Sequence, residues 1–140
     1  MSGLSRAGFW VALFFCLAAC SPSPGENVPL EQLCGDASKH EKRVTVEGFI
    51  TTKGMITFCS QGTCSLSLRA DAAKEDPSVT IGIRPGGGAN QMAELPERFK
   101  PEDLKVVDKE GQQLGNLSKV AVTGKALTGE GCQLLDVDLI

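Results

Sequence analysis

The chain has 140 residues, with 14 lysines and arginines against 17 aspartates and glutamates, a single histidine and six cysteines. That length suits one domain, with or without a targeting segment, and excludes a multidomain assembly. The single histidine excludes a histidine-rich metal site, and 41% hydrophobic with 22% charged residues excludes a wholly disordered chain.

The first 19 residues have the pattern of an export signal. Arg6 is their only charged residue, and all 13 residues from Ala7 to Ala19 are apolar or glycine. A membrane-spanning helix needs about 20 apolar residues, whereas the apolar region of a signal peptide has about 7–15. We therefore expect residues 1–19 to be a signal peptide that is absent from the mature protein.

The end of this segment, Leu17-Ala18-Ala19-Cys20, resembles the lipobox of bacterial lipoproteins. The resemblance implies that Cys20 carries the lipid, palmitate included, and becomes the new N-terminus, since stable anchoring takes more than one acyl chain. Ser21 rather than aspartate after the cysteine implies the outer membrane in a host with two membranes, with the domain facing the periplasm. The alternative is an ordinary signal peptide that happens to end near a cysteine.

The segment after Cys20 reads SPSPGENVP and is rich in proline, serine and glycine. That composition is typical of a linker. We expect residues 20–29 to form a lipidated, flexible tether and residues 30–140 to form the folded domain. One helical turn is expected after Pro29, ending at Gly35.

Period-two alternation of apolar and polar residues predicts five main strands. They cover residues 44–50 (continued by 55–58 after a break at Gly54), 65–69, 79–84, 119–127 and 135–139. Between the third and fourth strands we expect a short helix over residues 90–95 and an inserted hairpin over residues 104–114. In the last strand, alternation places Leu135, Val137 and Leu139 on the inward face.

This strand order resembles the OB-fold, a five-stranded Greek-key barrel. The stretches VTVEGFI (44–50) and KVAVTGKAL (119–127) look like the first and fourth strands of bacterial OB-fold lipoproteins related to the tRNA-anticodon-binding-like group. The resemblance implies a mainly β, small OB-like barrel. A different small β-barrel or a sandwich is the alternative fold.

Four of the six cysteines remain after Cys16 is removed with the signal peptide and Cys20 takes the lipid, and an even number in an exported chain indicates disulfides. Cys59 and Cys64 flank a four-residue turn at 60–63 and face each other across a hairpin, within disulfide range. Cys34 and Cys132 are then left to pair. A four-cysteine zinc site is the alternative, although no Cys-x-x-Cys pair supports it.

Candidate catalytic groups are few. His40 lies in a charged segment that we expect to be solvated, and Asp136 and Asp138 alternate with apolar residues on the last strand. The triple glycine at 86–88 lacks the lysine that follows in a phosphate-binding loop. We therefore expect neither an enzyme nor a cofactor or metal site.

Binding residues are expected on the outer face of the second and third strands, which OB-folds use for ligands. Alternation places Arg69 and Arg84 on that face, beside small serine and glycine residues. There the two arginines would converge on an anionic group, and Phe49 would offer a stacking surface.

The sequence favours a non-catalytic binding or scaffolding module for an envelope protein, peptidoglycan or another anionic glycan. An inhibitor of a host hydrolase is the alternative, presenting Gly62 or the loop at 86–90. Nucleic-acid binding is a further alternative, which the acidic charge disfavours: without Arg6 the mature chain carries a net −4 and three aromatic residues.

Overall fold

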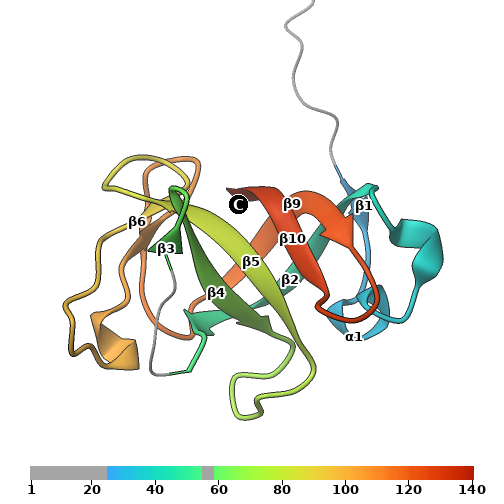
Figure 1. Cartoon of the computed structure of the whole chain (residues 1–140), viewed down its shortest axis with the longest axis horizontal. Coiled ribbons are helices and arrows are strands. Elements are labelled where there is room, and N and C mark those ends of the chain that lie inside the picture. Colours follow the sequence, from blue (N-terminus) through green and yellow to red (C-terminus); the bar gives the residue numbers. More distant parts are fainter. Residues whose placement is uncertain (1–24, 55–58) are drawn as a thin grey trace, which may run out of the picture.

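The computed structural model describes residues 25–54 and 59–140 (Figure 1). The predicted signal segment, Cys20 and the predicted strand extension at 55–58 lie outside these residues. The helical elements are α1 (Leu30–Leu33) and the 3-10 turns η1 (Ala37–Lys39) and η2 (Pro101–Asp103). The strands are β1 (Glu26–Asn27), β2 (Arg43–Thr52), β3 (Cys59–Ser60), β4 (Thr63–Arg69), β5 (Ser78–Pro85), β6 (Gln91–Met92), β7 (Val106–Val107), β8 (Gln113–Leu114), β9 (Lys119–Leu127) and β10 (Gln133–Leu139).

Five long strands close into a barrel. β2 pairs antiparallel with β4 and with β9, β4 pairs antiparallel with β5, and β9 pairs antiparallel with β10. A parallel pairing of β10 with β5 completes the ring. Around the barrel, the order of long strands is first, second, third, fifth, fourth, as in an OB-fold Greek key. The predicted mainly β, five-stranded OB-like barrel is confirmed.

Alternating side chains of the barrel strands fill its interior, because successive residues of a strand point to opposite faces. The fully buried side chains include Val44, Val46 and Ile50 of β2, Leu66 and Leu68 of β4, Ile81 of β5, Val122 of β9 and Leu139 of β10. Leu30 and Leu33 of α1 join this core, which confirms the predicted helical turn after Pro29. None of the helices in the described part of the chain has the length and apolar character needed to span a bilayer.

The packed domain begins before Leu30. Glu26 and Asn27 pair in parallel with Val44 and Thr45 of β2, and the Val28 amide donates to the Thr45 carbonyl over 3.0 Å. Val28 itself is 7% exposed. The predicted tether over residues 20–29 is therefore too long: its last residues form an extra strand, which composition did not reveal.

The segment between β5 and β9 lies on the opposite side of the barrel from α1 (Figure 1). Its hairpin, β7 with β8, confirms the predicted hairpin over residues 104–114. The predicted helix over residues 90–95 is wrong. Asn90 has a φ of 55°, a left-handed conformation that does not start a helix, and the next two residues form β6 between β5 and β7.

The last strand contains a bulge. Leu135 pairs with Lys125 of β9 and Asp138 with Thr123, so β10 has one more residue than β9 between these two pairs. Asp136, with a φ of 50°, lies at this bulge. As a result Leu134 is fully buried and Leu135 only half-buried, so the predicted inward position of Leu135 is wrong, whereas those of Val137 and Leu139 are correct.

Both expected disulfides are present. Cys34 and Cys132 are bonded with Cα atoms 5.5 Å apart, and Cys59 and Cys64 with Cα atoms 3.9 Å apart. Gln61 and Gly62 connect the Cys59–Cys64 hairpin, both with positive φ, as a tight two-residue turn requires. Because all four cysteines are oxidised, the alternative of a four-cysteine zinc site is wrong.

Candidate ligand-binding face

The outer face of β4 and β5 carries small polar side chains. Ser67 pairs with Thr80 and Ser65 with Gly82, and all four residues are half-buried. Alternation explains this composition: Leu66 and Leu68 of β4 and Val79, Ile81 and Ile83 of β5 point into the core, so their neighbours point out. Hydroxyl groups and a bare glycine make a face on which an extended chain can lie closely.

Arg69 and Arg84 lie at opposite ends of this face. Arg69 pairs with Ser78 at the start of β5, and Arg84 lies six residues further along the same strand. At about 3.3 Å per residue, the two backbone positions are about 20 Å apart. The expected convergence of the two arginines on one anionic group is therefore wrong, although both residues belong to the outward-facing set.

Lys53 contributes a third positive charge to the same face. It follows the end of β2, is exposed, and its Nζ donates to Thr80 Oγ1 over 3.0 Å. Thr80 lies between the positions of Arg69 and Arg84 along the β5 register. Alternation on β2 did not single out Lys53, although Lys53 continues by two residues the series of Glu47, Phe49 and Thr51, in which Thr51 is buried against Asn116.

Phe49 lies at the Arg69 end of the face. It pairs with Arg69 of β4 on one side and with Lys119 of β9 on the other, and it is half-buried. Phe49 also lines a hollow of about 570 Å³ that α1 and the residues after β1 border. The structure thus brings Phe49 and Arg69 together and separates both from Arg84.

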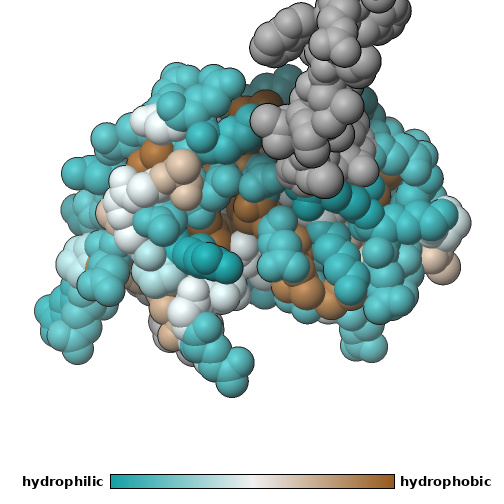
Figure 2. Space-filling model, turned by 90° about the horizontal axis from the view of Figure 1, so that it is seen from above, coloured by the Kyte–Doolittle hydropathy of each residue, from teal (hydrophilic) through white to brown (hydrophobic). Residues whose placement is uncertain are grey.

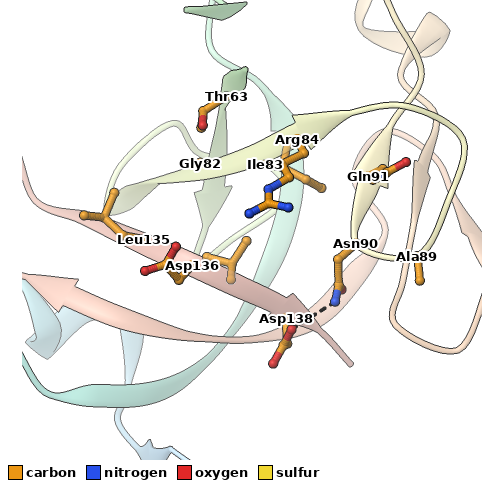
Figure 3. Close-up of a pocket in the computed structure, with 11 residues that line it drawn as sticks. Thr63, Gly82, Ile83, Arg84, Ala89, Asn90, Gln91, Leu135, Asp136 and Asp138 are labelled. Carbon is orange, nitrogen blue, oxygen red and sulfur yellow. Dashed lines mark hydrogen bonds between the residues drawn. The ribbon is translucent and has the colours of Figure 1, made fainter. Parts of the chain in front are cut away.

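A groove of about 480 Å³ opens between β5 and β10 at the Arg84 end (Figure 3). Its charged lining residues are Arg84, Asp136 and Asp138, and Ile83 and Val137 add apolar surface. The Arg84 guanidinium points into the space between the two strands, and Asn90 closes the far side (Figure 3).

Hydrogen bonds hold the loop after β5 against β10. The side chain of Asn90 makes both bonds: its Nδ2 donates to Asp138 Oδ1 over 2.9 Å, and its Oδ1 accepts from the backbone amide of Leu139 over 2.9 Å. Asp138 Oδ2 accepts from Arg43 Nη2 over 2.9 Å. On the loop itself, Gln91 Oε1 accepts from the Gly88 amide over 2.8 Å. The triple glycine at 86–88 is thus tied to the Gln91 side chain.

The free charges of the groove are Arg84 and Asp136. Both are exposed, and neither forms a salt bridge with another residue of the described ranges. Asp138, in contrast, is half-buried and has partners for both carboxylate oxygens. Two groups with displaced pKa values lie elsewhere, at η1: hydrogen bonds from Ser38 lower the pKa of Asp36, and a hydrogen bond to Glu26 raises the pKa of Lys39.

The remaining candidate residues do not come together in one site. His40 is exposed at the end of η1, where its Nδ1 accepts from the Thr128 amide over 3.2 Å. It contacts the β9–β10 loop and is absent from the lining of the groove that contains Asp136 and Asp138. Within residues 25–54 and 59–140, no group of three or more histidine, cysteine or acidic residues is placed to bind a metal ion.

Seen from above, the molecule is largely hydrophilic, and hydrophobic side chains show mainly in recesses among polar ones (Figure 2). Leu117 and Ile140 are the large hydrophobic residues exposed within the described ranges. The chain matches no family model, and neither a curated protein nor a solved structure is similar enough to be a match. The class of protein is therefore defined by the fold alone: a disulfide-stabilised, OB-like β-barrel.

Proposed function

We propose that this chain is an exported, lipid-anchored lipoprotein of the bacterial envelope that binds an anionic glycan through the outer face of β4 and β5. Its role is non-catalytic. The observation that carries the proposal is the face itself, where Arg69, Lys53 and Arg84 are spread over about 20 Å among small hydroxyl side chains.

The disulfides support export. Structural disulfides form and persist in oxidising compartments such as the periplasm, and they are rare in the cytosol. Cys34–Cys132 and Cys59–Cys64 account for every cysteine in the described part of the chain. This supports the interpretation of residues 1–19 as a signal peptide and leaves Cys20 for lipid.

The position of β1 bears on where the domain would work. If Cys20 carries the lipid, four residues separate it from Gly25, which lies five positions further along the chain and directly before β1. Such a link spans at most about 17 Å. The barrel is then held beside the membrane, which we propose to be the periplasmic face of the outer membrane, and its ligands must come to it.

The composition of the face favours an anionic glycan. Guanidinium and ammonium groups bind carboxylates or phosphates, hydroxyl groups exchange hydrogen bonds with sugars, and the half-buried Phe49 ring beside Arg69 offers an apolar surface for a sugar ring. Nucleic acid fits less well, because the mature chain has a net charge of −4 and only three aromatic residues with which to stack bases.

A pull-down tests the ligand class. The chain from residue 21, disulfides intact, is incubated with peptidoglycan fragments and solubilised envelope proteins, beside Arg69→Glu and Arg84→Glu variants, and Arg98→Glu serves as the off-face control. We expect glycan to be retained by the wild type and the control, and lost by the Arg69 variant. Equal retention by all variants would contradict the proposal that the β4–β5 face binds the glycan. Capture of an envelope protein alone would make that protein, and not a glycan, the ligand. Capture of a host hydrolase would favour the inhibitor alternative.

Membrane fractionation tests the anchor. A Cys20→Ser variant of the full chain is expected to leave the membrane fraction or to accumulate unprocessed. Recovery of this variant in the membrane fraction, at the wild-type amount and size, would contradict the lipoprotein proposal without bearing on the ligand.

A further inference from the structure

The groove between β5 and β10 is created by the bulge in β10. The two strands pair only at Gln133 with Thr80 and Leu134 with Ile81. The bulge then bends β10 away, and β5 next pairs on the β6 side, at Arg84 with Gln91. Within the described residues, Gly82 and Ile83 of β5 lie between these two pairings, so a short stretch of strand edge faces the groove.

The bulge also sets the charges of the groove. Asp136 takes the left-handed conformation at the bulge and lines the β10 wall, while Arg84 points in from the β5 wall. The two charges are opposite in sign, and no salt bridge joins them. Asp138 is already held by Arg43 and Asn90, so it fixes the wall and leaves Asp136 to face a ligand.

We propose that this groove binds a zwitterionic, amino-acid-like group, with the anionic end at Arg84 and the ammonium end at Asp136. The inference deepens the proposed function and rests on it for the envelope ligand: a glycan that lies along β4 and β5 and carries a short peptide would place the peptide's charged ends here. A zwitterionic lipid headgroup has the same pair of charges and is the other possible origin of the bound group.

Charge pairing selects this class of ligand. A simple anion at Arg84 would also face the Asp136 carboxylate, and a simple cation at Asp136 would face the Arg84 guanidinium. A neutral sugar would leave both charges without partners. A zwitterion satisfies both walls at once, and a peptide adds hydrogen bonds to the strand edge at Gly82. A volume of about 480 Å³ is within the range of small-molecule sites.

Titration followed by ¹⁵N nuclear magnetic resonance tests the inference on the chain from residue 21, which contains every described element. The ligands are glycine, diglycine, triglycine and tetraglycine, because the separation of the two walls sets the length that fits. For the best of these, the N-acetylated form lacks the ammonium and the C-terminal amide lacks the carboxylate. Phosphoethanolamine represents the lipid headgroup.

We expect one length to shift the amide signals of residues 82–84 and 135–138. Blocking either end should weaken binding about tenfold, as loss of a charge-assisted hydrogen bond does. Arg84→Gln should remove the difference between the free peptide and its amide, and Asp136→Asn the difference between the free peptide and its N-acetyl form. Asn tolerates the left-handed conformation, so the second variant keeps the bulge. Arg98→Gln should bind as the wild type does.

Absence of shifts in the groove for the whole series and for phosphoethanolamine would overturn the inference, as would N-acetyl and amide forms that bind as well as the free peptide. Tighter binding of phosphoethanolamine than of any peptide would keep the zwitterion and assign the source to lipid. Glycan retention that depends on Arg69, without binding of any peptide or of phosphoethanolamine in the groove, would remove the groove inference and leave the proposed function standing.

Discussion

The barrel has two contrasting seams. β2 and β9 pair without interruption over seven residues, from Arg43 with Lys125 to Phe49 with Lys119. β5 and β10, which close the ring, pair over two residues only, in the parallel orientation. The long seam buries Val44, Val46 and Val122, whereas the short one opens into the groove with Arg84 and Asp136.

The contrast separates stability from binding in this small molecule. A continuous antiparallel ladder satisfies its own backbone groups and offers nothing to a ligand on that edge. The short seam depends on other devices, namely the Cys34–Cys132 bond at the start of β10 and the Asn90 bridge near its end. Those devices allow a gap between β5 and β10 without opening the barrel.

The largest effect is expected from removing the disulfide beside the short seam. The Cys34–Cys132 bond joins residues 98 positions apart, so replacing both by serine should lower the free energy of unfolding by up to about 4–5 kcal/mol. Replacing Cys59 and Cys64, five positions apart, should cost only about 2 kcal/mol. Urea unfolding of both double variants measures the difference. Equal losses would mean that the short seam needs no covalent support.

A matched pair of glycine substitutions compares the seams directly. A Cβ at Gly48 on β2 would lie 2.6 Å from the Arg69 carbonyl oxygen, whereas a Cβ at Gly82 on β5 would lie 2.9 Å from Thr63 Cγ2, in an exposed residue. A backbone atom in a paired strand cannot move away, but a surface side chain can. Gly48→Ala should cost about 1–3 kcal/mol, and Gly82→Ala less than about 1 kcal/mol. Thermal unfolding that gave the opposite order would contradict the contrast.

Loss of the Asn90 bridge should have a smaller and more local effect. Asn90→Ala removes two hydrogen bonds to β10, for a loss of about 1–2 kcal/mol, and should speed hydrogen exchange at the Leu139 amide. Asn116→Ala is the control: its side chain accepts from Thr51 at the end of β2. The control removes one hydrogen bond, so it should cost about 0.5–1.5 kcal/mol and leave Leu139 exchange unchanged. Faster exchange at Leu139 in both variants would mean that Asn90 has no special role.

The smallest effect concerns pH and lies outside both seams. The Ser38 hydroxyl and amide donate to Asp36, which lowers the pKa of Asp36 from 3.8. A depressed pKa in the folded state means that the ionised form stabilises the fold above pH 3.8 and that this contribution is lost as the pH falls below it. Ser38→Ala should flatten the acid limb of the stability curve slightly. An unchanged acid limb would show that the interaction contributes nothing.

The sequence pattern predicted the parts of the fold that local residue patterns determine. Alternation located all five barrel strands, and the Cys59–Cys64 turn required no long-range information. The errors lie where tertiary contacts decide. Glu26 and Asn27 are strand only because β2 has a free edge there, and Asn90 is left-handed only because β10 binds its side chain.

The candidate site was harder to predict because the sequence pattern does not reveal how far apart residues on paired strands lie, nor where a strand contains a bulge. Arg69 and Arg84 were correctly placed on the outer face, but their separation follows from the antiparallel register, which sets Arg69 opposite Ser78. Leu134 and Leu135 are adjacent and both apolar, so alternation allows either of them to point into the core. The pattern therefore gave no sign of the bulge that places Asp136 in the groove.

Amide hydrogen exchange with and without bound ligand shows whether the ligand occupies the β4–β5 face and the adjoining short seam, while the long seam is structural. We expect the fraction captured from peptidoglycan to slow exchange in β4, β5 and residues 135–138, and to leave exchange in β9 and α1 unchanged. Protection confined to α1 or to the β2–β9 seam would contradict this assignment.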